Sequence, residues 1–187
     1  RRGGLVPNEI TYSSVINACA KGDQWHRALD LLDEMRRCGM APDVITYSSV
    51  INACAKGDEW QRALGLLNEM RSRGLVPNEI TYSSVINACA KGGESQQALN
   101  LLEEMRRCGL VPNVITYSSV IDACAKGGEG LRAFELLDEM RSRGLVPNEI
   151  TYIGSAKARE RGEDWEGAVE LQEERRAEGV EPDERTD

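Results

Sequence analysis

The five tyrosines of this chain stand at one place in a repeating pattern. Tyr12, Tyr47, Tyr82, Tyr117 and Tyr152 follow one another at intervals of 35 residues without a slip. A fixed period of this length is typical of proteins built from stacked repeats. In such proteins each repeat contacts only its neighbours, so the period predicts a solenoid rather than a domain with one compact core. Function must therefore be sought in one repeat and in its variations.

The first half of a repeat has the apolar spacing of an amphipathic helix. Tyr12, Val15, Ile16 and Cys19 follow the spacing i, i+3, i+4, i+7, which places four apolar groups on one helix face. Lys21 and Gly22 then end the helix. A second stripe lies opposite, because Ser13, Asn17 and Lys21 are four residues apart and Ile10 lies one turn ahead of Ser13.

The second half of a repeat predicts a second helix. Its apolar face consists of Ala28, Leu31, Leu32 and Met35. We expect Asp23 to be its N-cap, Gly39 to end it, and Asp43 to cap the first helix of the next repeat. Because one hairpin cannot bury both apolar faces by itself, neighbouring hairpins must stack. The predicted fold is therefore all-α: a right-handed α-solenoid superhelix of helix-turn-helix repeats.

The period also predicts the organisation of the chain. The segments are the end of a preceding repeat (1–8), four repeats (9–43, 44–78, 79–113 and 114–148), a degenerate fifth repeat (149–183) and a tail (184–187). The fifth repeat is degenerate because Ile153 and Gly154 replace the Ser-Ser pair of the others. Since residues 1–8 align with 71–78, we expect the chain to be a piece of a longer array.

The charge pattern bears on the kind of partner. A net charge of −8 and a pI near 4.9 argue against a nucleic-acid partner when taken alone. However, four of the five lysines end the first helices, whereas the acidic residues Asp30, Asp33 and Glu34 belong to the second. Such segregation permits a row of cations on an acidic protein. The alternative is that these lysines only favour the C-terminal ends of the helices.

Several other classes of protein are disfavoured. The six cysteines show no CxxC spacing, so we expect reduced thiols of an intracellular protein and no intramolecular disulfide. No apolar run is long enough to cross a bilayer, so we expect no membrane partner. His26 is the only histidine, and no nucleophile-base pair or metal-ligand cluster accompanies it. We therefore expect no enzyme activity, no metal, no cofactor and no small-molecule substrate.

The repeat resembles a known family. VITYSSVINACAKGDEWQRALGLLNEMRSRGLVPN, residues 44–78, is similar to the P-class pentatricopeptide repeat, with its V-T-Y start, Cys-Lys-x-Gly end of the first helix and G-x-x-P-[DN] close. The resemblance covers essentially the whole chain. It implies binding of single-stranded RNA, one base per repeat, in a mitochondrial or chloroplast protein that serves RNA processing or stability.

The resemblance also implies roles for particular residues. Each base is read by the fifth and the last residue of a repeat, and the RNA runs 5′ to 3′ as the chain runs from N to C. The pairs are Ser13 with Asp43, Ser48 with Asn78, Ser83 with Asn113, and Ser118 with Asn148. A hydroxyl paired with Asp favours guanine and one paired with Asn favours adenine, so the expected preference is 5′-GAAA-3′. The residues that pack between bases are Ile10, Ile45, Ile80, Ile115 and Ile150. The residues that meet phosphate are Lys21, Lys56, Lys91 and Lys126.

Two alternatives stay open on the sequence. The Asp and Asn residues at the repeat junctions can be plain helix caps, a role that both perform about equally well. The solenoid itself can be a scaffold for protein-protein interaction, as concave helical-repeat surfaces often are. Overall acidity favours the scaffold, and the ordered stripe of Ser, Asn and Lys favours RNA.

Overall fold

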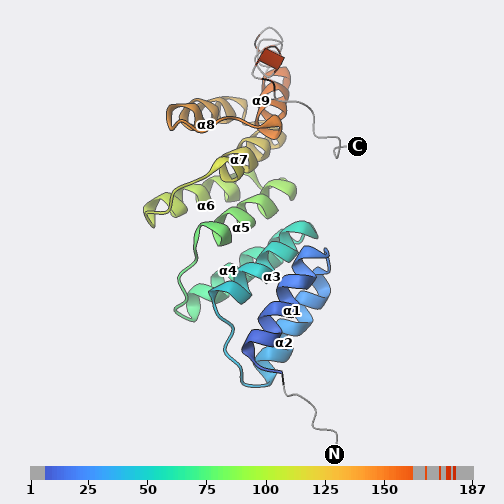
Figure 1. The fold of residues 1–187 in the computed structure, drawn as a ribbon. Helices are drawn as coiled ribbons and strands as arrows, with labels where there is room; N and C mark the ends of the chain where they lie inside the picture. The colour runs from blue at the N-terminus through green and yellow to red at the C-terminus, as the bar shows by residue number, and fades with distance from the viewer. Residues whose placement is uncertain (1–6, 162–166, 168–172, 174–175, 178, 180–187) are drawn as a thin grey trace, which may run out of the picture. The chain divides into compact units, whose positions relative to one another are not determined.

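The computed structural model describes residues 7–161 together with residues 167, 173, 176, 177 and 179. Within that part of the chain all regular secondary structure is α-helical (Figure 1). The helices are α1 (Glu9–Lys21), α2 (Trp25–Arg37), α3 (Val44–Lys56), α4 (Trp60–Ser72), α5 (Glu79–Lys91), α6 (Ser95–Arg107), α7 (Val114–Gly127), α8 (Gly130–Ser142) and α9 (Glu149–Arg161). The prediction of an all-α repeat solenoid is confirmed, and its handedness stays a prediction. Residues 1–6, most of the second half of the fifth repeat and the tail 184–187 lie outside the described residues.

The chain divides into two compact units, residues 1–88 and residues 89–187. In the first unit, α1 packs against α2 and α3, and α3 packs against α4. In the second, α7 packs against α6, α8 and α9. Each unit is thus built from antiparallel hairpins whose first helices also contact each other, as the repeat pattern predicts.

The apolar stripe of each first helix forms the core. In α3, Tyr47, Val50, Ile51 and Cys54 have no exposed surface. In α1 the equivalent Val15 is 41% exposed, because no described hairpin precedes the first repeat. Burial of these apolar groups is the main favourable contribution to the stability of each unit.

The ends of the helices agree with the sequence in two places and differ in one. Asp43 accepts a hydrogen bond from the Thr46 backbone N–H at 2.8 Å, so its predicted N-cap role is confirmed. Gly39 has φ of +73° just beyond α2, a left-handed conformation that suits glycine. The prediction that Asp23 caps α2 is wrong. The N-cap is Gln24, and Asp23 takes a left-handed turn conformation with φ of 56°.

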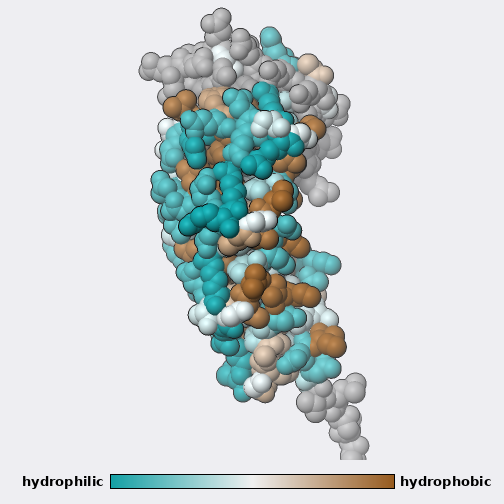
Figure 2. Space-filling model, turned by 90° about the vertical axis from the view of Figure 1, so that its left-hand side faces the viewer, coloured by the Kyte–Doolittle hydropathy of each residue, from teal (hydrophilic) through white to brown (hydrophobic). Residues whose placement is uncertain are grey.

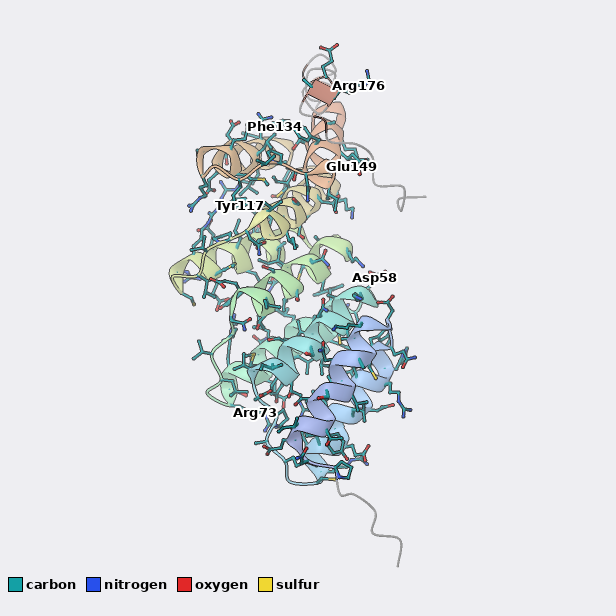
Figure 3. All side chains as sticks on the ribbon, in the orientation of Figure 1. Asp58, Arg73, Tyr117, Phe134, Glu149 and Arg176 are labelled. Carbon is teal, nitrogen blue, oxygen red and sulfur yellow. The ribbon has the colours of Figure 1, made fainter. Side chains whose placement is uncertain are left out.

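The left-handed turn recurs at the same place in later repeats. Asp58, labelled in Figure 3, has φ of 60°, and Gly93 and Gly128 both have φ of +77°. Aspartate tolerates this conformation better than most residues, because its short polar side chain can bond locally. The turn between the helices, and not a cap, therefore explains the Asp or Gly at this position.

A hydrogen-bonded ion pair joins successive repeats on the second-helix side. The Tyr117 hydroxyl, labelled in Figure 3, donates to Glu139 Oε1 at 2.9 Å. Arg106, on α6 of the preceding repeat, donates to Glu139 Oε2 at 2.6 Å and to the tyrosine oxygen at 3.3 Å. Burial acts to raise the pKa of Glu139, but the Tyr117 bond and the nearby guanidinium groups outweigh it and hold that pKa below the usual value. At least one carboxylate of the second helices, that of Glu139, therefore stabilises the contact between successive repeats.

The cysteines divide into buried and exposed groups. Cys19, Cys54, Cys89 and Cys124 are buried, and Cys38 and Cys108 are exposed. Burial raises the pKa of Cys54 to about 11 and that of Cys124 to about 12, so these thiols are poor nucleophiles at neutral pH. The four buried residues confirm the core role, and the absence of disulfides stays a prediction.

Candidate nucleic-acid interface

A cleft between the first two repeats collects residues that the sequence predicts to bind a base. The cleft has a volume of about 340 Å³. Ile10, Ser13 and Asn17 of α1 lie on one side, and Asp43 and Ile45, at the start of α3, lie on the other. The first predicted base-reading pair and two predicted stacking residues therefore line one open pocket.

The predicted stacking isoleucines are exposed, although their neighbours on the same helices are fully buried. Ile10 is 74% exposed and Ile45 is 66% exposed, whereas Ile16 and Ile51 have no exposed surface. The equivalents Ile80, Ile115 and Ile150 are also exposed. On the face shown in Figure 2, hydrophobic residues lie in separate groups among hydrophilic ones. Isolated apolar groups of this kind beside polar ones suit stacking against a flat aromatic ligand.

The predicted base-reading serines are less accessible than their place opposite the core stripe suggests. Ser13 is partly exposed, but Ser48 is only 7% exposed and Ser118 only 2%. Each hydroxyl lies 2.7 Å from a threonine hydroxyl of the next repeat: Ser13 from Thr46, Ser48 from Thr81, and Ser118 from Thr151. Ser48 and Ser118 therefore lie at the base of the interface between repeats, whereas Ser13 also borders the open pocket.

These threonines were missed by the sequence reasoning. Thr46, Thr81 and Thr151 have no exposed surface and contact both members of a predicted base-reading pair. The signal was available, because a threonine recurs every 35 residues, three positions after the Asp or Asn cap. A polar side chain at this place in a helix can complete a reciprocal cap with the N-cap residue, as Thr11 and Thr116 do.

The predicted Asp and Asn partners are helix caps. Asp43 Oδ1 accepts from the Thr46 backbone N–H at 2.8 Å and from its hydroxyl at 2.7 Å. Asn78 Oδ1 accepts the equivalent bonds from Thr81 at 3.0 Å and 2.9 Å. Only one side-chain atom takes part in each cap. The other atom, Oδ2 in Asp43 and Nδ2 in Asn78, is where the two residues differ, so capping and base reading are compatible.

The remaining predicted pairs lie in or next to the second unit. Asn148 Oδ1 lies 3.0 Å from Ser118 Oγ and accepts from the Thr151 backbone N–H at 3.0 Å. Asn113 caps α7 in the same way. Ser83 belongs to the first unit and Asn113 to the second, so the third pair remains a prediction from the sequence.

The predicted phosphate-binding lysines end the first helices, and Lys56 and Lys126 contact carboxylates. Lys56 Nζ lies 3.0 Å from Asp23, in the turn of the preceding repeat. Lys126 Nζ lies 2.7 Å from Asp122, which stands where the first three repeats have asparagine. Both lysine side chains remain at least 39% exposed. Exposed ion pairs are weak, so a phosphate can compete with these carboxylates.

Repeat five departs from this pattern at the serine position. Ile153 occupies the serine position, and Ser155 occupies the position of the buried valines. Ser155 is fully buried, and its hydroxyl makes no hydrogen bond within the described residues. A methyl group on Gly154 would lie 3.4 Å from the Asp122 backbone, so α9 lies close against α7.

The described residues offer no site for metal chemistry or for a membrane span. No group of three or more His, Cys, Asp or Glu residues among them is placed to hold a metal ion. His26 is exposed and stacks on Trp25, with ring centroids 3.3 Å apart. None of the described helices is both long enough and apolar enough to cross a bilayer.

Comparison with known families finds the same repeat along the chain. A model described as PPR repeat family matches residues 7–56, and one described as PPR repeat matches residues 45–75. A third, described as pentatricopeptide repeat domain, matches residues 65–128 and 100–154. None of the curated proteins compared with the chain matched it.

Solved structures give a consistent result. The chain is similar to the pentatricopeptide repeat protein PPR10 in complex with an 18-nt psaJ RNA element, with a TM-score of 0.72 and 29% identity over 90% of this chain. It is also similar to PPR10 from maize, with a TM-score of 0.68 and 33% identity over 98% of this chain. These matches span only about a quarter of PPR10, 25% and 26%. The PPR domain of Arabidopsis thaliana PRORP1 in complex with tRNA has a TM-score of 0.79 at 19% identity, covering 94% of this chain and 93% of that one, which shows a shared fold.

Proposed function

Because the chain belongs to the pentatricopeptide repeat family, we propose that it binds single-stranded RNA, one base per repeat. The observation that carries the proposal is the cleft in which exposed Ile10 and Ile45 flank Ser13 and Asp43. Two apolar side chains can hold a base by stacking while the polar pair meets its edge. The likeness to an RNA-bound PPR10 supports the same role.

The proposed preference is 5′-GAAA-3′, with the RNA running 5′ to 3′ along the chain. Asp43 offers an acceptor to the N1–H and N2–H₂ donors of guanine. Asn78 Oδ1 is used in the cap, so Asn78 offers its Nδ2 donor to N1 of adenine, and the serine hydroxyl beside it can accept from N6–H₂. Asn113 and Asn148 repeat the adenine pattern. The fifth repeat carries Ile153 at the serine position and is assigned no base.

The lysines at the ends of the first helices are the proposed phosphate contacts. Lys21, Lys56, Lys91 and Lys126 recur with the period of the repeat, so each can meet one phosphate of an extended strand. Asp23 and Asp122 compete with phosphate for two of these lysines and weaken the electrostatic contribution.

The proposed setting is a longer array in a mitochondrion or chloroplast, where RNA binding serves RNA processing or stability without catalysis by this segment. A protein-protein scaffold is the second candidate, favoured by the net charge of −8 and by the carboxylate partners of Lys56 and Lys126. In the scaffold role the exposed isoleucines would contact a protein.

Fluorescence anisotropy with labelled RNA tests the proposal. Stacking contributes about 1–3 kcal/mol per base and association costs several kcal/mol, so four repeats should bind a strand containing GAAA with a Kd that is about micromolar or weaker. A duplex of the same sequence should not compete. Ile45→Ala should weaken binding, and Leu131→Ala, which truncates an even more exposed apolar residue on α8, should not. Equal affinity for strand and duplex, or no binding at low salt, would favour the scaffold.

A further inference from the structure

We infer that the buried threonine at the third place of a repeat sets the hydrogen-bonding polarity of the base-reading pair beside it, an inference that rests on the proposed function. Thr46 would act on the pair Ser13 and Asp43, and Thr81 on the pair Ser48 and Asn78. These threonines have no exposed surface, so they cannot touch a base themselves. They are positioning residues.

The orientation of the Asn78 amide is fixed by the backbone. The Thr81 N–H donates to Asn78 at 3.0 Å, so the side-chain atom that it meets must be the oxygen and not the nitrogen. The Thr81 hydroxyl lies 2.9 Å from the same oxygen. That oxygen has no proton, so the threonine hydroxyl must donate to it.

The direction of the next bond follows from proton counting. A hydroxyl has one proton and two lone pairs. The proton of Thr81 is used on Asn78, and one lone pair accepts the Asn78 backbone N–H at 3.3 Å. In the 2.7 Å contact with Ser48, threonine can therefore only accept, and serine must donate. The hydroxyl of Thr81 is then fully hydrogen-bonded.

This hydrogen-bonding pattern determines which donors and acceptors each repeat presents to a base. The proton of Ser48 is used inside the protein, so its hydroxyl oxygen can only accept, while Asn78 presents its Nδ2 donor. An acceptor beside a donor matches the N6–H₂ and N1 of adenine. In the first repeat, Thr46 lies 2.7 Å from both Ser13 Oγ and Asp43 Oδ1, so the same reasoning gives two acceptors, which match the two donors of guanine.

Because the threonine fixes the serine proton, the choice between Asp Oδ2 and Asn Nδ2 determines which purine is preferred. A serine free to rotate can also donate, for example to O6 of guanine, so the pair would then reject the wrong purine less strictly. With its proton held by threonine, only the Asp or Asn atom varies between the repeats. In the fourth repeat the direction of the serine hydroxyl is fixed less firmly, because Ser118 Oγ also lies 2.7 Å from the Val114 carbonyl, which competes for its proton.

The test removes one hydroxyl and keeps the shape of the side chain. Thr81→Val should reduce the preference for GAAA over GGAA by about two- to tenfold, since the freed Ser48 hydroxyl can donate to guanine while Asn78 still favours adenine. Preference at the first base, GAAA against AAAA, should stay as in the wild type. Thr81→Ser restores the hydroxyl and should restore the preference. All ratios are measured on the full chain by competition in fluorescence anisotropy.

Thr11→Val is the matched control. Thr11 makes the same cap to Asn8, at 3.0 Å and 2.9 Å, but no serine of a preceding repeat lies among the described residues. It should lower the melting temperature by less than Thr81→Val does, because Thr11 is exposed, and it should leave base preference alone. If Thr81→Val does not fold, Thr46→Val tests the same hydrogen-bonding pattern, and its preference for guanine over adenine should fall at the first base only.

The outcomes separate this inference from the proposed function. Wild-type preference at the second base in Thr81→Val would show that the threonine only caps α5, and the inference would be overturned while RNA binding stands. Loss of preference at both bases would indicate general damage and would also overturn it. If the wild-type chain bound no single-stranded RNA at all, the proposed function would fail first and the inference with it.

Discussion

Asn78→Asp should move the preferred second base from adenine to guanine, so that GGAA replaces GAAA. The neighbouring repeat provides the reference, because Asp43 makes the same cap that Asn78 makes. Their cap distances are 2.8 and 2.7 Å in Asp43 and 3.0 and 2.9 Å in Asn78. The substitution therefore keeps the cap and changes one atom, the Nδ2 donor, to an acceptor.

The size of the effect follows from that one atom. An adenine N1 facing a carboxylate oxygen leaves two acceptors together, and an unmet polar group costs about 1–3 kcal/mol. The relative affinity for GGAA over GAAA should thus rise by about five- to a hundredfold. Stability should change little, because Asp and Asn are about equal as N-caps and a negative charge at a helix N-terminus adds about 0.3–1 kcal/mol.

Competition between the two oligonucleotides on wild type and variant provides the measurement. The added negative charge weakens all RNAs alike, so the ratio of the two affinities is the informative quantity. Asn8→Asp is the control, since it adds the same charge at the cap of α1. If the two RNAs rank as in the wild type while the protein stays folded, Asn78 is a cap only and the base-reading role fails.

Three further substitutions test other parts of the structure. Asp122→Asn removes a carboxylate that lies 2.7 Å from Lys126 Nζ and competes with phosphate, so it should steepen the salt dependence of RNA binding by about 0.7 in slope. An unchanged slope would argue against Lys126 as a phosphate contact. Ser155 has a buried hydroxyl without a hydrogen bond among the described residues, and the equivalent residues Val50, Val85 and Val120 are valines. Ser155→Val should therefore raise the free energy of unfolding in urea by about 1–2 kcal/mol. A decrease would contradict the packing of α9. The pKa of Glu139 is lower in the folded protein than in the unfolded chain, so its ion pair stabilises the fold at neutral pH and this stabilisation is lost as the pH falls through the pKa of the folded state. Glu139→Gln should therefore lower the melting temperature more at pH 7 than at about pH 3. An equal decrease at both pH values would show that the charge of Glu139 does not contribute.

Local features of this protein could be predicted from the sequence. The 35-residue period and the apolar spacing of Tyr12, Ile16 and Cys19 predicted stacked helical hairpins, because periodicity along one helix fixes which face is apolar. The cap at Asp43 was also predictable, since it involves residues three apart in one turn. The exposure of Ile10 and Ile45 agrees with the stripe that the sequence placed opposite the core.

The error at Asp23 shows where local rules compete. Aspartate is a favoured N-cap and also tolerates a left-handed turn, and both roles fit the start of a second helix. In the structure Asp23 takes the left-handed turn conformation, and its Oδ1 lies 3.0 Å from Nζ of Lys56 in the next repeat. The presence of Gly93 and Gly128 at the same place was the available sign of a left-handed conformation.

Only the tertiary structure decided which polar groups meet between repeats. Ser48 and Thr81 are 33 residues apart, and Arg106, Tyr117 and Glu139 come from three different helices. The first four repeats carry each of these residues, but a period fixes their place within a repeat and not their partner in the next one. Partnership depends on how far each hairpin is shifted and rotated against its neighbour, which the packing of the apolar faces sets. The burial of the serines, and with it the hydrogen-bonding polarity of the cleft, follows from that packing.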